Sequence, residues 1–162
     1  MSGLVLGVDP DLGGALAWID LDTGDLVELI DMPVLELKTK RILDVSQLAV
    51  ILDARASATT AATIEISQMR PGQGAPSART TGYNYGALVG LIRAQFIRLD
   101  EVAPVTWKRA MKVSADKETS RRAASLLWPS ECARWRFKKD HGRAEAALIA
   151  AYGARQLRRV AA

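Results

Sequence analysis

Two hydrophobic periodicities alternate along the chain, and together they predict its secondary structure. Short apolar runs rich in β-branched residues predict five strands, at 3–9, 15–20, 26–32, 60–67 and 96–103. Apolar residues three and four positions apart predict helices at 44–57, from about Gly82 to 95, and at 106–113, 117–129 and 141–159. The stretch from 68 to about Gly82 is rich in Gly, Pro and Ser, which predicts a long loop.

The order of these elements predicts an α/β fold. Only the turn sequences PDLGG and DTGD separate the first three strands, so these strands should form an antiparallel meander. A helix precedes each of the last two strands, which is typical of parallel joins. We therefore expect a five-stranded mixed sheet flanked by helices, and one domain spanning residues 1–162.

Composition places the chain among ordinary globular proteins, with 49% hydrophobic and 25% charged residues. It has no apolar run of about 18 residues, so we expect no membrane span and no membrane partner. The start, MSGLVLGVDP, has the pattern of neither a signal peptide nor a transit peptide; if the natural protein enters an organelle, its leader is expected to be absent here. Cys132 is the sole cysteine, which excludes an internal disulfide and favours a reducing compartment.

Charge is distributed unevenly along the chain. Residues 1–101 carry 8 basic and 13 acidic side chains, a net of −5, whereas residues 102–162 carry 14 and 5, a net of +9. The basic part also contains three of the four tryptophans, at 107, 128 and 135. This combination suits a surface for a polyanion such as nucleic acid, although a solvated basic helix face would give the same count.

Acidic residues stand at the ends of two predicted buried strands. Asp9 ends the first strand and Glu65 follows the apolar run ATI in the fourth. If these strands are neighbours, the two carboxylates lie close together and repel each other, so a cation is expected between them. Mg²⁺, or Mn²⁺ in its place, is the natural occupant of such an oxygen-rich site. Asp9 precedes Pro10 and is equally compatible with a turn.

The stretch FKKDHGRAEAALIAAYG adds two further candidates. His141, the only histidine, and Glu145 are four residues apart, so they share one face of the predicted C-terminal helix. If that helix packs against the edge of the sheet, Glu145 supplies a third carboxylate and His141 a ligand or a proton carrier. The alternative is that His141 only marks the start of the helix, with Asp140 as its N-cap.

Six motifs, in order along nearly the whole chain, resemble one known family. They are GVDPDLGGALA, IEIS, GYNYGALVG, WKRAMKV, KETSRRAASLLWP and KKDHGRAEAALIAAYG. The chain resembles the RuvC-type Holliday junction resolvases of the ribonuclease H-like superfamily, in particular the plastid resolvases of plants and algae. The stretch after Glu65 matches the family poorly.

The resemblance implies a ribonuclease H-like fold and a Mg²⁺-dependent endonuclease that cuts four-way DNA junctions by paired symmetric nicks. It implies that Asp9, Glu65, His141 and Glu145 are the catalytic and metal-binding groups, with two metal ions per site. Bacterial members usually place the last two groups three residues apart and end on Asp, whereas this chain has the plastid spacing of four. They also usually carry Gln after the strand-end Glu, where this chain has Ile66.

The resemblance also implies partners and a location. The partners are a four-way DNA junction and a second copy of the chain, with no nucleotide cofactor; the location is the chloroplast, or otherwise the cytoplasm. Candidate DNA contacts by position are Lys108, Lys117, Arg70, Gln73, Arg79, Tyr83 and Tyr85. The two tyrosines fit stacking on unpaired bases or, alternatively, packing between helix and sheet.

Two other functions are compatible with parts of the sequence. GVDPDLGG also resembles the phosphate loop of actin-like ATPases, but those proteins close two such domains on the nucleotide and this chain has 162 residues. A non-catalytic junction-binding protein with the same fold is the second alternative. The presence of all four candidate groups argues against that loss of activity.

Overall fold

The computed structural model describes residues 3–69 and 71–161. A five-stranded sheet in the order β3-β2-β1-β6-β7 forms its centre. The strands are β1 (Leu4–Asp9), β2 (Ala15–Asp20), β3 (Leu26–Asp31), β6 (Thr59–Glu65) and β7 (Arg98–Val102). The first three strands pair antiparallel, whereas β6 is parallel to β1 and β7 is parallel to β6. The predicted mixed sheet with its initial meander is confirmed.

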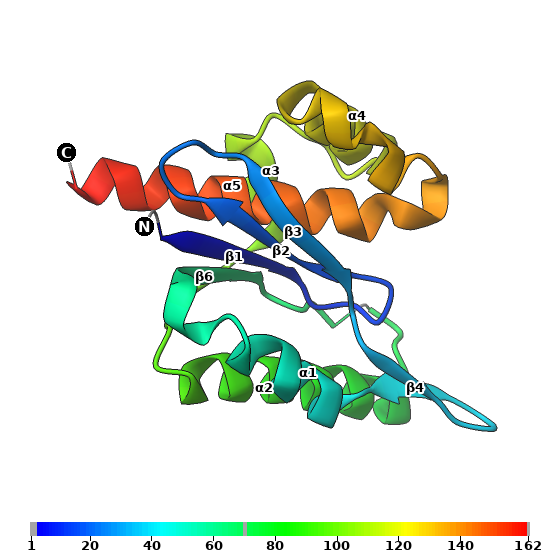
Figure 1. Ribbon diagram of the computed structural model, residues 1–162. Coiled ribbons are helices and arrows are strands. Elements are labelled where there is room, and N and C mark those ends of the chain that lie inside the picture. The colour runs from blue at the N-terminus through cyan, green and yellow to red at the C-terminus, as the bar shows by residue number, and fades with distance from the viewer. Residues whose placement is uncertain (1–2, 70, 162) are drawn as a thin grey trace.

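Helices cover both faces of this sheet (Figure 1). On one face lie α1 (Val45–Asp53) and α2 (Ala75–Ala94), packed on a core that includes Leu48, Leu88 and Ile92. The other face carries α3 (Pro104–Ala110), α4 (Lys117–Leu127) and α5 (His141–Ala161). The segment between α4 and α5 forms the short 3-10 helices η2 (Pro129–Trp135) and η3 (Lys138–Asp140). Within the described residues, no helix is both long and apolar enough to cross a membrane.

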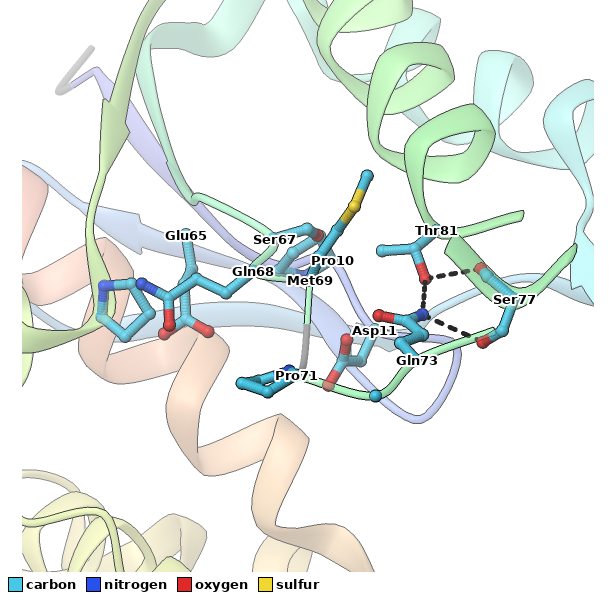
Figure 2. A pocket seen from close by; sticks show the side chains of 12 residues that line it. Pro10, Asp11, Glu65, Ser67, Gln68, Met69, Pro71, Gln73, Ser77 and Thr81 are labelled. Carbon is cyan, nitrogen blue, oxygen red and sulfur yellow. Dashed lines mark hydrogen bonds between the residues drawn. The ribbon is translucent and has the colours of Figure 1, made fainter. Parts of the chain in front are cut away.

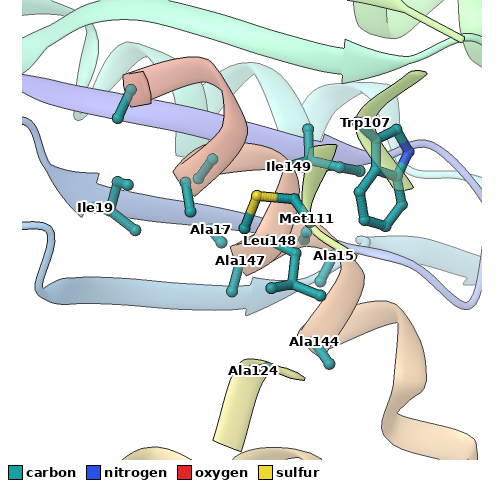
Figure 3. Packing of buried hydrophobic residues seen from close by; sticks show 14 of the residues in the cluster. Ala15, Ala17, Ile19, Trp107, Met111, Ala124, Ala144, Ala147, Leu148 and Ile149 are labelled. Carbon is teal, nitrogen blue, oxygen red and sulfur yellow. The ribbon is translucent and has the colours of Figure 1, made fainter. Parts of the chain in front are cut away.

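Helix α5 lies unusually close to strand β1 because both contribute small residues. The buried positions of α5 are mostly alanine, as Figure 3 shows for the cluster between helix and sheet. At Gly7, a Cβ atom would lie 2.2 Å from the amide nitrogen of Ala150 and 2.3 Å from the carbonyl oxygen of Ala146. Only glycine permits this backbone approach. The contact brings the start of α5 to the carboxyl end of β1.

Two local predictions were wrong, and one hairpin was not predicted. Helix α2 begins at Ala75, about two turns before Gly82, with Pro76 in its first turn. Within it the hydroxyls of Thr80 and Thr81 donate to the carbonyl oxygens of Pro76 and Ser77. A hairpin of β4 (Val34–Glu36) and β5 (Arg41–Leu43) was not predicted, since three-residue strands carry no readable periodicity. Asp140 does not cap α5: its carboxylate accepts a hydrogen bond from the Phe137 amide and closes η3.

Candidate active site

The two strand-end acids meet as predicted. Strands β1 and β6 are parallel neighbours with Val8 opposite Ile64, so the next residues, Asp9 and Glu65, leave the sheet at the same edge. Asp9 is only 4% exposed, and the β1–β2 turn folds over it, with Gly14 against its carboxyl group. Polar groups at the carboxyl edge of parallel strands are a common origin of α/β active sites.

Helix α5 brings a third carboxylate to this edge. Glu145 lies one turn into the helix and is 7% exposed. A Cβ atom at Gly142 would lie 3.0 Å from Oδ2 of Asp9 and 2.4 Å from the carbonyl oxygen of Gly13, so the first turn presses directly on the β1–β2 turn. The first turn of the helix therefore packs beside the strand-end acids, as the sequence predicted.

Burial and mutual repulsion raise the pKa of the carboxyl groups at this edge. Burial raises the pKa of Asp9 well above its usual value, and three neighbouring carboxylates raise it further, in the order Asp11, Glu145 and Glu65. Burial also raises the pKa of Glu65; Glu145 and Asp11 add to this rise, while the indole of Trp107 and the ammonium of Lys108 oppose it. Four carboxylates thus share one edge with little compensating positive charge.

Helices α3 and α4 orient two of these carboxylates. The indole Nε1 of Trp107 donates to Oε2 of Glu65 at 2.5 Å. The next residue, Lys108, places its ammonium 3.1 Å from Oε1 of Glu145, and the buried Ser120 hydroxyl donates to the same oxygen at 3.0 Å. Both acids are therefore held in fixed orientations by groups from neighbouring helices.

His141 begins α5 and lies one helical turn before Glu145. Its ring Nδ1 lies 3.2 Å from the carbonyl oxygen of Lys138. It is not among the charged neighbours that shift the pKa of Asp9 or Glu65. Its contact is thus with the backbone that leads into the helix.

The donor set fits a hard divalent cation in its chemistry. Asp9, Glu65 and Glu145 supply carboxylate oxygens that repel one another, which is the condition under which Mg²⁺ or Mn²⁺ binds. The ammonium of Lys108 forms an ion pair with Glu145 and neutralises its charge, as a metal ion would. Among the described residues, no three His, Cys, Asp or Glu side chains stand in a ready-made ligand arrangement.

An open cleft of about 670 Å³ runs from Glu65 toward the start of α2 (Figure 2). It is lined mainly by the strand-end turns and by residues 67–69 and 71–73, and Asp11 lies beside Gln73 in this lining. Gln73 donates to the hydroxyls of Ser77 and Thr81, which fixes one wall of the cleft. Two of the four carboxylates, Asp11 and Glu65, therefore face this open cleft.

The predicted DNA contacts occupy different places. Lys108 lies inside the site, Gln73 lines the cleft, and the exposed residues are Lys117 at the start of α4 and Arg79 and Tyr83 on α2. Tyr85 packs against the core and donates to Glu101 at 2.8 Å, as the packing alternative predicts. Arg70 lies outside the described residues.

Three contributors to the site were missed by sequence reasoning. Asp11 lies within PDLGG, which the sequence predicts only as a turn, but its charge acts on both Asp9 and Glu65. Its position two residues after a strand-end acid was the available signal. Trp107 and Ser120 gave none, because an indole or hydroxyl in an amphipathic helix looks like any core or surface residue until its partner is known.

Solved structures share this fold along nearly the whole chain. Thermus thermophilus RuvC in complex with a Holliday junction substrate matches with a TM-score of 0.62 and 18% identity over 95% of this chain and 96% of that one. The yeast mitochondrial Holliday junction resolvase Ydc2 matches with a TM-score of 0.64 and 14% identity over 99% and 81%. The chain therefore has the ribonuclease H-like fold of RuvC-type resolvases.

A curated relative gives a match in sequence. Holliday junction resolvase MOC1, chloroplastic, from Chlamydomonas reinhardtii, is 31% identical over 91 residues. These residues are 55% of this chain and 10% of that protein, so the similarity spans about a tenth of the relative's length. No protein-family model matches the chain.

Proposed function

We propose that this protein is a Holliday junction resolvase, a metal-dependent endonuclease that makes paired symmetric nicks in four-way DNA junctions. The observation that carries the proposal is the gathering of Asp9, Glu65 and Glu145 at one sheet edge of a RuvC-type fold. Buried carboxylates that raise one another's pKa are costly, and such clusters concentrate at functional sites. The names of the sequence relative and of the structural matches support the same substrate.

Each group has a distinct task in this proposal. Asp9, Glu65 and Glu145 would hold the metal ions, with His141 as a further ligand or as the carrier of a proton. A bound divalent ion supplies Lewis acidity, by lowering the pKa of an attacking water and stabilising the leaving 3′-oxygen. Trp107 and Ser120 keep Glu65 and Glu145 oriented, and Lys108 provides positive charge at the place where a phosphate would approach Glu145.

Substrate geometry supports a two-fold assembly. A four-way junction has two equivalent strands to cut, and a C2 dimer presents two matched sites. The basic residues after position 101 would hold the DNA backbone. A chloroplast location, taken from the name of the relative, stays a prediction that a fluorescent fusion of the natural protein would test.

The decisive experiment compares wild-type protein with Glu65→Gln on a labelled synthetic junction, with cuts mapped on all four strands in Mg²⁺ and in EDTA. Glu65→Gln removes a charge while keeping the side-chain shape, so it should abolish cleavage and leave junction binding intact. Glu36→Gln, in the exposed β4–β5 hairpin, is the matched control and should cut normally. Symmetric nicks with 5′-phosphate and 3′-hydroxyl ends support the proposal.

Two outcomes oppose the proposal in different ways. Tight junction binding by wild-type protein without cleavage in Mg²⁺ or Mn²⁺ would support the non-catalytic alternative. Free nicking of linear duplex with the junction left intact would identify a nuclease of another specificity.

A further inference from the structure

An exposed aromatic ring stands between two cations just before α5. Phe137 is 59% exposed and follows Arg136, whose Cζ lies 5.8 Å from the ring centroid. The ammonium of Lys139 lies 6.0 Å from the same centroid. We call the exposed residues 136–139 the Phe137 platform.

The backbone under the Phe137 platform is held in place by charged side chains. Arg121 donates to the carbonyl oxygens of Trp135, at 2.7 Å, and Arg136. Arg143 donates to the carbonyl oxygen of Arg134 at 2.9 Å, and the Phe137 amide donates to Asp140 at 3.2 Å. A ring held on such a frame loses little conformational entropy on binding.

The positive charge of the Phe137 platform is available to a ligand. The neighbouring Arg134 and Arg143 are paired with Glu131 and Asp31. By contrast, no acidic partner of Arg136, Lys138 or Lys139 is found among residues 3–69 and 71–161. Arg136 and Lys139 beside the ring, and the exposed Lys138 between them in sequence, therefore have no ion pair within these residues.

The Phe137 platform lies next to the carboxylates. Lys139 lines a cleft of about 330 Å³ together with Gly13 and Gly14, and Gly14 lies against Asp9. His141 connects the two regions, since its ring contacts the Lys138 carbonyl and its helix carries Glu145. A DNA strand whose phosphate reached the carboxylates would pass beside the Phe137 platform within a few nucleotides.

We propose that the Phe137 platform binds an unpaired nucleobase of the DNA substrate near the cut, with Phe137 stacked on the base and Arg136, Lys138 and Lys139 on the flanking phosphates. The inference rests on the proposed function and assigns a contact within it. Exposed aromatic rings with adjacent cations bind single-stranded nucleic acid by stacking, independently of sequence. Inside a paired duplex the faces of the bases are covered, so this contact selects a branch where strands separate.

Phe137→Ala tests the inference, with Phe96→Ala as the matched control. Phe96 is 99% exposed and lies between the end of α2 and the start of β7, at the amino end of the parallel strands. Its loss therefore removes an equal ring from a surface away from the carboxyl ends of the strands. Junction binding is measured in Ca²⁺ by titration. The value of about 1–3 kcal/mol per stacked base predicts affinity about 5- to 150-fold weaker for Phe137→Ala. Phe96→Ala should bind as wild type, and Phe137→Trp, which keeps an aromatic ring at this position, should retain the wild-type affinity.

A spectroscopic measurement locates the contact. With 2-aminopurine placed at each position around the branch, wild-type protein should change the fluorescence at one or two positions, and Phe137→Ala should abolish that change. Lys138→Gln and Lys139→Gln should keep the fluorescence signal, and each should make the negative slope of log affinity against log salt shallower by about 0.9.

Failure of this inference is distinguishable from failure of the proposed function. If wild-type protein cuts junctions while Phe137→Ala matches Phe96→Ala in affinity and fluorescence, the Phe137 platform does not bind DNA and the proposed function stands. If wild-type protein neither binds nor cuts junctions, both are wrong.

Discussion

Replacing Asp9 by Asn should stabilise the metal-free protein while abolishing its activity. Asp9 is buried beside three other carboxylates, and burial together with their charges raises its pKa well above the usual value of 3.8. A carboxyl group with a raised folded-state pKa stabilises the fold only while it is protonated. Its contribution is complete below the unfolded pKa and is lost as the pH rises through the folded pKa. At higher pH the ionised Asp9 therefore opposes folding, and Asn removes this penalty.

The size of the effect follows from the surroundings of the carboxylate. The hydrogen bond that it accepts from the Asp11 amide, at 3.3 Å, is long and can be kept by an Asn side-chain oxygen. An inadequately compensated buried polar group costs about 1–3 kcal/mol, and more when charged. For a chain of 162 residues each kcal/mol shifts the melting temperature by about 3 °C, so we expect a rise of about 3–9 °C.

The assay is thermal unfolding in EDTA across a pH series, with Asp31→Asn as the matched control. The pKa of Asp31 is lowered by its hydrogen bonds to Arg143, so Asp31→Asn should lower the melting temperature, whereas Asp9→Asn should raise it. Wild-type protein should lose stability as the pH rises from about 4, whereas Asp9→Asn should lose less. Mn²⁺ should restore the wild-type stability at high pH. A lower melting temperature for Asp9→Asn in EDTA at high pH would refute the reasoning.

Three further predictions follow from packing and hydrogen bonding. Trp107→Phe should lower the junction cleavage rate and the affinity for Mn²⁺ about 10- to 100-fold with little change in junction binding, because Glu65 loses an orienting donor. Trp135→Phe also loses an indole hydrogen bond, but away from the site, so it should change neither the cleavage rate nor the affinity for Mn²⁺. Gly7→Ala should cost about 1–3 kcal/mol or more in unfolding free energy, because its Cβ would collide with the backbone of α5. Gly86→Ala, at an open position of α2, should instead stabilise by up to about 1 kcal/mol in the same denaturation experiment. A Trp107→Phe variant as active as Trp135→Phe, or a Gly7→Ala protein as stable as wild type, would contradict these arguments.

The main strands and helices could be predicted from the sequence because the hydrophobic pattern that produces each of them lies within one stretch of chain. The buried strands that end at Asp9 and Glu65 and the amphipathic helix that carries Glu145 each have a period that a single stretch of chain displays. The helices between the later strands predicted parallel joins, but whether the strands that end at Asp9 and Glu65 are neighbours was left open by the sequence. The structure pairs β1 with β6 in parallel, which brings the two acids to one edge of the sheet.

The start of α2 and the β4–β5 hairpin could not be predicted in the same way. The first turns of α2 contain Pro76, Ser77 and two threonines, which locally favour turns, and the helix forms because its later turns pack on the sheet. In β4–β5 the strands are too short to carry a period; their pairing with each other and the burial of Leu43 in the core stabilise them. Here tertiary context outweighed local preference.

The sequence by itself determined which carboxylates stand at the strand ends and on the helix face, because the hydrophobic period of each strand or helix fixes the face on which a side chain lies. Only the tertiary structure decided how those carboxylates are held. Trp107 meets Glu65, and Lys108 and Ser120 meet Glu145, across 42, 37 and 25 residues of chain. Likewise, Gly7 admits α5 to the sheet through a contact more than 130 residues away in sequence. Such partners are chosen by shape and packing in three dimensions, and no local pattern in the chain records them.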